Sequence, residues 1–347
     1  MNSPLLNLQT RVGTLGLVIA CSLVSLPSAT AQVVPGTGAR VENLGDDFED
    51  PNWSYTLNLP KSSRNIDKDV RQPLGFSSNN RWFESAKRGT PDLVQRVDTP
   101  AGGLSGSTGA MLLRSRDTGV PGRPSHESQQ DDFLLRGANI SVNNSPSVVV
   151  RVYLPPFEEW EPYTDVSFGM RAGVRGPMTK TEAEWEKFDL ELGREPERRR
   201  NRRGFFKGRL SNRPITRTEA YYPGFFIQFN SKNDPRFQED SAVFVVRADT
   251  NGHDFLGPQI KQTGWWTLGM SFTPDGRVHY YARPGVEDLT PADHIASHLP
   301  YGTKCESFYT FFFNVCSQDN GRSWSTPWII DDCWVYQMPA YQAASRR

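Results

Sequence analysis

One stretch of the sequence, residues 264–283, alternates apolar side chains with side chains that could bind a ligand or carry a proton. Successive strand residues point to opposite faces of a sheet, so a strand, a Pro-Asp-Gly turn at 274–276 and a second strand would separate the two kinds. The apolar face, from Trp266 to Ala282, is typical of a sheet core. The other face carries Trp265 and the small residues Thr267, Gly269 and Ser271 on the first strand, beside the large polar residues Arg277, His279, Tyr281 and Arg283 on the second. The small residues leave room above the sheet, and the pattern predicts half of a ligand-binding groove.

Three further segments show the same alternation, at 148–154, 166–174 and 224–230. Each has one apolar face and one face with arginine, tyrosine or amide side chains beside small residues. If these strands share a sheet with 264–283, one face displays a set of polar side chains: Arg151, Tyr153, Arg171, Gln228, Asn230, His279, Tyr281 and Arg283. This set has arginines but no carboxylate, which fits a carboxylated or sulfated glycan, because arginine binds such groups bidentately. Trp265 would stack on the sugar faces, and the alternative is an ordinary solvent-facing sheet.

The same face suits β-elimination on uronate polymers. That reaction needs a group that neutralises the sugar carboxylate and a base that takes the proton of the adjacent carbon. Arg151 or Arg171 with Gln228 could neutralise the carboxylate, and His279 or Tyr281 could act as base and acid. A polysaccharide lyase is therefore one alternative function.

A glycoside hydrolase needs two carboxylates at a defined separation. The nearest run of acids, residues 186–191, lies on a predicted helix. There Asp189 and Glu191 point about 200° apart, because successive helix residues turn by ~100°. If the protein is an enzyme, the sequence favours a polysaccharide lyase over a glycoside hydrolase.

The elements that must position these side chains are strands. The chain has 347 residues with 29 Gly and 26 Pro, which fits a turn-rich β protein better than a helical one. Strong strand patterns, most of them separated by turn signals, cover 148–154, 165–174, 222–230, 242–248, 264–273, 277–283, 307–316 and 328–336. Many strands with few helices predict an all-β fold, a two-sheet antiparallel jelly-roll β-sandwich.

Three motifs resemble the concanavalin A-like lectin/glucanase superfamily, including its laminin-G-like domains. Asp47-Phe48-Glu49 resembles the first strand, 266–281 the tryptophan-containing hairpin with an Asp-Gly turn, and 328–336 the closing strand. The resemblance covers 46–337 and implies the sandwich fold. Related sandwiches often hold a structural calcium near the terminal strands, so the resemblance implies one calcium site, with the carboxylate ligands Asp47, Glu49, Asp331 and Asp332.

The N-terminus has the pattern of a secretory signal peptide. Arg11 is the only charge before the apolar stretch 12–26, and Ala29-Thr30-Ala31 offers a cleavage site. The stretch is shorter than the ~20 residues of a membrane span, and no later segment could cross a bilayer. We expect a secreted or periplasmic protein of bacterial origin, with a lipoprotein anchored at Cys21 as the alternative. The expected divisions are a signal peptide at 1–31, a linker at 32–45, one domain at 46–337 and a tail at 338–347.

One segment near 178–215 departs from the strand pattern. Thr181-Glu182-Ala183-Glu184 resembles a capping box and predicts a helix to about Leu192. Residues 194–213 then hold nine Arg or Lys and two Glu. Such a block is usually a solvated loop or insertion, and the alternative is a site for an anionic ligand or a partner.

Three cysteines remain after the predicted cleavage: Cys305, Cys316 and Cys333. If the run between the first two is one straight strand, they lie ~35 Å apart at ~3.3 Å per residue, too far for a disulfide. Cys333 would then be the shared partner, and three buried reduced thiols are the alternative.

Lys and Arg total 39, and so do Asp and Glu, so the net charge suggests no nucleic-acid partner. Together these features predict an extracytoplasmic carbohydrate-binding protein, with acidic polysaccharides favoured as its ligands. A polysaccharide lyase that uses the same face, and a cell-envelope interaction protein that docks a partner through its basic segment, are the alternatives. We expect no cofactor beyond the structural calcium.

Overall fold

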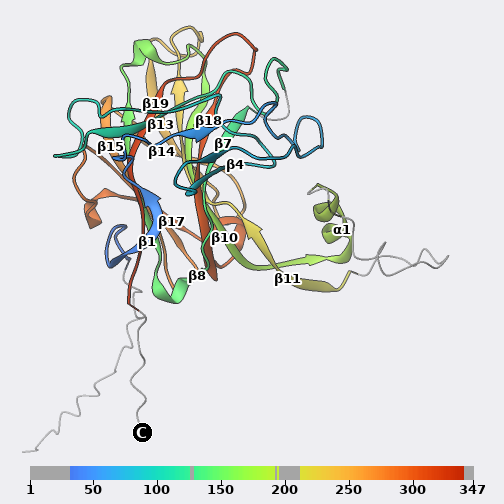
Figure 1. Ribbon diagram of the computed structural model, residues 1–347. Coiled ribbons are helices and arrows are strands. Elements are labelled where there is room, and N and C mark those ends of the chain that lie inside the picture. Colours follow the sequence, from blue (N-terminus) through green and yellow to red (C-terminus); the bar gives the residue numbers. More distant parts are fainter. Residues whose placement is uncertain (1–31, 126–128, 192–193, 195–211, 340–347) are drawn as a thin grey trace, which may run out of the picture. The chain divides into compact units, whose positions relative to one another are not determined.

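Two antiparallel β-sheets pack face to face (Figure 1). The computed structural model describes residues 32–125, 129–191, 194 and 212–339. The predicted signal peptide, most of the basic segment and most of the predicted tail lie outside these residues. Every strand pairing in the described part is antiparallel. The predicted all-β two-sheet sandwich is therefore confirmed.

The first sheet, sheet A, has eight strands in the described residues. They are β1 (Ala39–Asp46), β5 (Leu93–Asp98), β6 (Gly109–Arg114), β9 (Ser147–Leu154), β15 (Gly264–Phe272), β16 (Val278–Pro284), β17 (His294–His298) and β19 (Trp328–Gln337). Their order is β17-β16-β15-β9-β19-β6-β5, and β1 pairs with β19. The predicted hairpin at 264–283 thus becomes β15 and β16.

The second sheet, sheet B, has eleven strands in the same part of the chain. They are β2 (Tyr55–Thr56), β3 (Phe76–Ser77), β4 (Trp82–Glu84), β7 (Gln130–Leu135), β8 (Ile140–Ser141), β10 (Asp165–Thr181), β11 (Pro214–Tyr221), β12 (Gly224–Asn230), β13 (Ser241–Arg247), β14 (Phe255–Ile260) and β18 (Ser307–Cys316). The order is β14-β13-β12-β10-β18-β7-β4-β3-β2, with β11 on β10 and β8 on β18.

Helices are few in the described residues. The α-helix is α1 (Glu182–Glu191), and the 3-10 turns are Val142–Asn144, Phe157–Glu159, Pro291–Asp293 and Pro300–Gly302. None of the described helices is long and apolar enough to cross a membrane.

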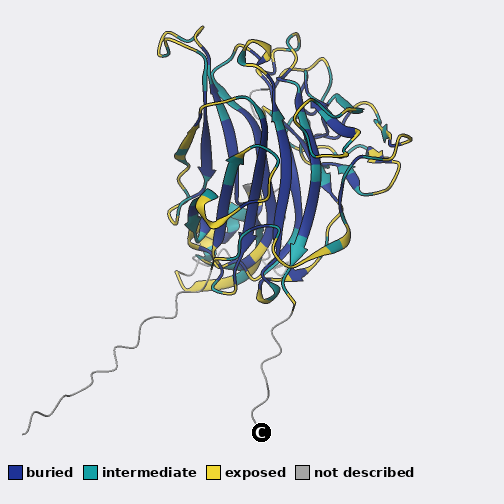
Figure 2. Ribbon diagram, turned by 90° about the vertical axis from the view of Figure 1, so that its left-hand side faces the viewer, coloured by how far each residue is buried: buried dark blue, intermediate teal, exposed yellow. Residues whose placement is uncertain are grey.

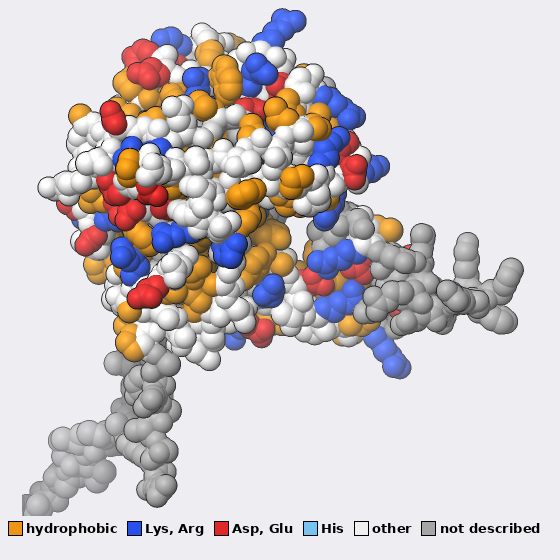
Figure 3. Space-filling model, in the orientation of Figure 1, with side chains coloured by type: hydrophobic (Ala, Val, Ile, Leu, Met, Phe, Trp, Pro, Cys, Tyr) orange, Lys and Arg blue, Asp and Glu red, His pale blue; other side chains and the backbone are white. Residues whose placement is uncertain are grey.

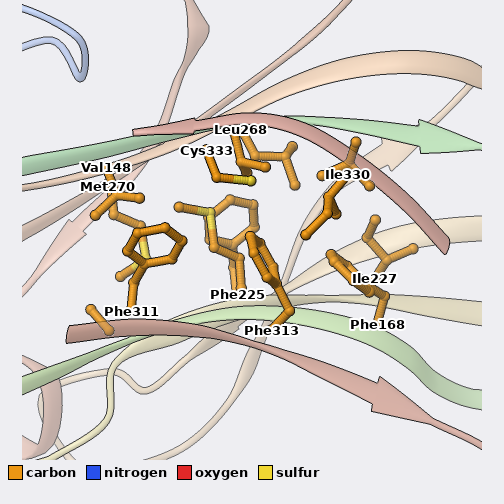
Figure 4. Close-up of a cluster of buried hydrophobic side chains, with 14 of the residues drawn as sticks. Val148, Phe168, Phe225, Ile227, Leu268, Met270, Phe311, Phe313, Ile330 and Cys333 are labelled. Carbon is orange, nitrogen blue, oxygen red and sulfur yellow. The ribbon is translucent and has the colours of Figure 1, made fainter. Parts of the chain in front are cut away.

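The core lies between the sheets, where inward side chains from both meet (Figure 4). Apolar residues at alternate positions point inward, as the period of two along a strand requires. Val148 and Met270 come from sheet A and Phe313 from sheet B, and all three are fully buried. Phe168 stacks on Phe313 with ring centroids 5.6 Å apart. The strands with the clearest alternation in the sequence are the buried strands of the sandwich (dark blue in Figure 2).

The folded part begins earlier than the sequence predicts. Much of the predicted linker at 32–45 belongs to β1, which pairs with β19. Asp46, at the end of β1, is buried, and its Oδ2 accepts hydrogen bonds from Nε1 of Trp53 at 3.1 Å and of Trp82 at 3.0 Å. Alternation could not reveal this strand, because most of its residues are exposed or half-buried.

The three described cysteines are buried free thiols. Cys305 and Cys316 lie just before the start and at the end of β18, and Cys333 lies on the other sheet. The alternative of three reduced thiols is therefore the one that the structure shows.

β10 runs past the edge of the sandwich into a two-stranded arm (Figure 1). Its pairing with β18 ends at Arg175, and from Gly176 to Thr181 its partner among the described residues is β11. The predicted capping box then starts α1: the N–H of Thr181 donates to the Glu184 carboxylate at 2.7 Å, and Oγ1 of Thr181 accepts from the N–H of Glu184 at 3.4 Å. We call the described residues 176–191, 194 and 212–219 the arm.

Candidate functional site

The outer face of sheet A, where the sequence predicts the groove, is covered by other parts of the chain. Trp265 points outward as predicted, yet it is only 5 % exposed. Its Nε1 donates to the carbonyl of Pro100 at 3.2 Å. The room beside Gly269 is filled as well, since a Cβ there would lie 2.7 Å from Pro35. The predicted groove on this face is therefore occupied by the chain itself.

The polar residues of this face are tied to the same covering segments. Arg151 forms an ion pair with Asp288 at 2.8 Å. Nη1 of Arg283 donates to the carbonyl of Asp288 at 2.9 Å. Tyr153 packs against Trp265 with ring centroids 5.5 Å apart. Each of these side chains thus has a partner within the protein, and Arg151 itself is 6 % exposed.

His279 and Tyr281, predicted as the base and acid of a lyase, are buried on this face. The two ring nitrogens of His279 lie 2.6 Å from Oγ of Ser297 and 2.8 Å from Oγ1 of Thr273. Burial lowers the pKa of His279 to about 4 and raises the pKa of Tyr281. Their enclosure contradicts the predicted catalytic roles.

Arg171, Gln228 and Asn230 lie on sheet B instead of sheet A. The predicted groove of eight residues is therefore divided between two sheets, which corrects the prediction. Alternation assigns a side chain to one face of its own strand, but it does not show which strands pair. Nε2 of Gln228 donates to Oδ1 of Asn230 at 2.9 Å. Of the eight residues, Arg171 is the one that lines the cleft described next.

A cleft of about 1000 Å³ opens on the outer face of sheet B. β10, β18 and β7 contribute Arg171, Phe312 and Leu134 to its lining. Its cationic side chains are Arg64, Lys68, Lys87, Arg88, Arg171 and Arg194, and Asp132 is the acid among its lining residues. Figure 3 shows Lys and Arg side chains around hydrophobic ones where the sandwich meets the arm. The cleft is thus strongly cationic on a chain without net charge.

Arg171 is the buried cation of this cleft, with 9 % of its surface exposed. Its Nε and Nη2 donate to the carbonyl of Tyr222 at 3.1 and 2.9 Å. The guanidinium lies 5.6, 5.8 and 5.5 Å from the ring centroids of Tyr222, Phe226 and Phe312. Burial, and after it the charge of Arg247, lowers the pKa of Arg171 to about 10. Among the described residues no carboxylate lies within ion-pair distance of Arg171, although Asp132, farther off in the same cleft, attracts the guanidinium and by itself would raise its pKa.

Two loops bring further cations to the cleft. The carbonyl of Lys87 accepts backbone hydrogen bonds from Arg64 at 3.0 Å and from Asn65 at 3.2 Å, which holds the loops together. Burial lowers the pKa of Lys87, and the positive charge of Arg88 lowers it further. Like charges held this close repel one another, and a bound anion would relieve the repulsion.

A buried ion cluster anchors the start of the first of these loops. Nζ of Lys61 lies 2.7 Å from Asp131 and 3.1 Å from Asp92, and it donates to the carbonyl of Asp117 at 2.6 Å. Burial by itself would lower the pKa of Lys61, but attraction to the two aspartates raises it. This ammonium group has two carboxylates within ion-pair distance, whereas the Arg171 guanidinium in the cleft has none among the described residues.

Two tyrosines add flat apolar surfaces beside the cations. Tyr222 is 39 % exposed, and its ring packs edge-on to Phe312 at 5.9 Å. The ring of Tyr309 lies over Gly173, where a Cβ would come within 2.6 Å of it. The guanidinium of Arg175 lies 4.5 Å from the Tyr309 ring centroid. Aromatic rings with polar edges suit sugar rings, which have apolar faces and hydroxyl rims.

Sequence reasoning found Arg171 and missed the residues around it. Arg64 and Lys87 lie on loops without periodicity, outside the strand patterns that the sequence shows. Tyr309 lies opposite a register shift between β10 and β18, where simple alternation fails. The signal available in the sequence was the density of Arg and Lys among the turns of residues 61–88.

The predicted calcium ligands do not form a metal site. Within the part of the chain that the structure describes, no three His, Cys, Asp or Glu side chains are placed to hold a metal ion. Glu49 accepts hydrogen bonds from Thr108, Asp331 accepts one from Ser107 at 2.8 Å, and Asp332 accepts one from Trp334 at 3.1 Å. The set Asp47, Glu49, Asp331 and Asp332 therefore does not fit a calcium ion, and we derive no role from one.

The substitution Asp331→Asn is expected to stabilise the protein at alkaline pH. Burial, and then the charge of Asp332, raises the pKa of Asp331 to about 7, above the ~3.9 of an unfolded aspartate. The folded state therefore holds this proton more tightly, so the contribution of Asp331 to stability is greatest below pH ~4 and is lost as the pH rises through about 7. Urea unfolding should show that the variant gains about 1–2 kcal/mol over the parent at pH ~8 and less at pH ~5. An equal effect at both pH values would contradict the raised pKa.

No family model matches this chain, and neither does any curated protein. Solved structures that resemble it include an alginate lyase from Pseudomonas aeruginosa, 11 % identical with a TM-score of 0.36, covering 71 % of this chain and 86 % of that one. A second is an endo-β-1,4-glucuronan lyase from Trichoderma reesei, 11 % identical with a TM-score of 0.32, covering 82 % of this chain and 95 % of that one. A third is the lectin UEA-II complexed with galactose, 10 % identical with a TM-score of 0.30, covering 72 % of this chain and 100 % of that one. These TM-scores lie below 0.5, so no ligand or activity is transferred from them. The strand pairing itself defines the class, a two-sheet sandwich of the kind that the resemblance to the concanavalin A-like superfamily implied.

Proposed function

We propose that this protein is an extracytoplasmic protein that binds acidic polysaccharides in the cleft of sheet B. The observation that supports this most is Arg171, a buried guanidinium in an open cleft with no ion-paired carboxylate among the described residues. A buried charge without a directly paired carboxylate carries a desolvation penalty, and a bound anion would supply a direct partner. The extracytoplasmic location rests on the signal pattern of residues 1–31.

The spacing of the charges favours a polymer over a small anion. Arg64 and Lys87 come from loops, Arg171 from the sheet and Arg194 from the arm, so the positive charge extends across the cleft. A uronate polymer carries one carboxylate on each acidic sugar, and arginine binds carboxylates bidentately. The exposed ring of Tyr222 lines the same cleft and offers a face for a sugar ring.

β-Elimination is the second candidate function, and Lys87 favours it. Lys87 lines the cleft, and partial desolvation together with the charge of Arg88 lowers its pKa, which favours the neutral amine that a base needs. In such a reaction Arg171 would neutralise the sugar carboxylate, and the base would take the proton from the adjacent carbon. The electron pair of that C–H bond would form a double bond as the glycosidic C–O bond breaks, and the leaving oxygen would take up a proton. Tyr309, which also lines the cleft, could donate that proton.

An assay on a panel of uronate-containing polymers separates these functions. The protein is incubated with each polymer, the ultraviolet absorbance of unsaturated sugar ends is followed, and retention on the same polymer is measured in parallel. We expect retention on at least one acidic polymer and none on a neutral glucan. Rising absorbance would add the lyase activity, whereas equal retention on neutral and acidic polymers, or no retention at all, would overturn the proposal.

A further inference from the structure

The arm supplies two residues to the lining of the cleft. Leu190 lies in the last turn of α1, and Arg194 follows shortly after it. Both line the cleft together with Tyr222 and Tyr309. Part of the wall of the cleft is therefore formed by the end of α1 and the residue that follows it, which belong to neither sheet.

The position of α1 on the arm is fixed by packing. Trp185 is almost fully buried, and its Nε1 donates to the carbonyl of Ile215 on β11 at 2.8 Å. The guanidinium of Arg217 lies 4.6 Å from the Trp185 ring centroid and forms an ion pair with Asp189 at 3.0 Å. These contacts hold α1 against β11, so the side chains at the end of the helix have a defined place in the cleft.

The two arm residues have the chemistry of the rest of the cleft. Leu190 is 52 % exposed, so its apolar surface is not used in the core. Arg194 forms an ion pair with Glu219 at 2.8 Å, which orients its guanidinium while leaving about half of the side chain exposed. An apolar surface beside an oriented cation repeats the combination of Tyr222 and Arg171.

We infer that the arm forms a second sugar subsite, which binds units of the same acidic polymer beyond those held over Arg171. This inference rests on the proposed function and adds a length requirement to it. Contacts at two places on one polymer strengthen each other, because the first contact raises the effective concentration of the second segment. Oligomers that reach from Arg171 to Leu190 and Arg194 therefore bind more tightly than shorter ones.

The test is a titration of the protein with uronate oligomers of increasing length, from the disaccharide upward. The parent protein is compared with the double variant Leu190→Ala/Arg194→Ala and with Lys187→Ala as a control. Lys187 lies on the exposed side of the same helix and does not line the cleft, and its replacement removes one positive charge, as does Arg194→Ala. Circular dichroism of each variant checks that the arm and the sandwich still fold.

For the parent and the control, we expect affinity to rise with length until the arm is reached. The double variant should lose about tenfold in affinity for the long oligomers and less than about twofold for the short ones. An equal loss at every length, or no loss at any length, would overturn the subsite. Absence of binding of all oligomers to the parent protein would instead overturn the proposed function, so the two failures are distinguishable.

Discussion

Replacing Arg171 by alanine is expected to weaken the binding of uronate polymers by about a hundredfold, the effect of losing a central buried anchor. The guanidinium is enclosed by three aromatic rings and fixed by the carbonyl of Tyr222. A charge held in this way needs no reordering when it meets a carboxylate, and it acts where water is largely excluded. Affinity can be measured by calorimetric titration at low and at moderate salt concentration.

Two comparison variants make the result specific. Arg171→Lys keeps the charge but loses the bidentate geometry, so it should recover only part of the affinity. Arg283→Ala removes a cation from the outer face of sheet A, where the sequence predicted the groove, and it should change affinity by less than about twofold. If Arg283→Ala weakened binding as much as Arg171→Ala, the site would not be the cleft of sheet B.

Replacing Lys61 by methionine is expected to destabilise the fold by about 3–5 kcal/mol. The substitution leaves Asp131 and Asp92 facing each other without their shared cation, and Asp131 is completely buried. Urea unfolding at pH ~7 measures the loss. Lys68→Met, at an exposed position on the same loop, serves as the control and should change stability by less than about 0.5 kcal/mol.

A second variant separates the lost ion pair from a general packing defect. Adding Asp131→Asn to Lys61→Met removes one of the two orphaned charges, so part of the stability should return. If the double variant were less stable than Lys61→Met by the full effect of Asp131→Asn alone, the two side chains would not be coupled. That result would contradict the ion cluster as the anchor of the loop.

Local alternation predicted the inner faces of the strands well. Met270, Phe313 and Val148 point into the core because a strand of period two with one apolar face buries that face. Alternation also placed Trp265 on the outer face correctly. It could not show that residues from elsewhere in the chain cover that face, since such coverage depends on contacts far apart in sequence.

The location of the site depended on strand pairing and on loops, and neither follows from periodicity. Arg171 and His279 have the same local pattern, yet β10 and β16 belong to different sheets. Lys61 looks like an ordinary loop lysine in the sequence, and its burial is decided by Asp131, which is 70 residues away. The cleft combines cations with aromatic rings, but its lining includes Asp132, whereas the predicted set of side chains had no carboxylate.

In the described residues β10 and β11 continue from the sandwich into the arm, and from Gly176 to Thr181 β10 pairs with β11 and no longer with β18. The side chains of Leu190 and Arg194 can therefore be exchanged without altering the strand register or the packing of the core. Selection would act on mutations of these residues through their effect on ligand specificity and hardly through their effect on folding. In a lineage of such proteins, preference for one sugar sequence over another could diverge quickly at the arm while the two sheets stayed the same.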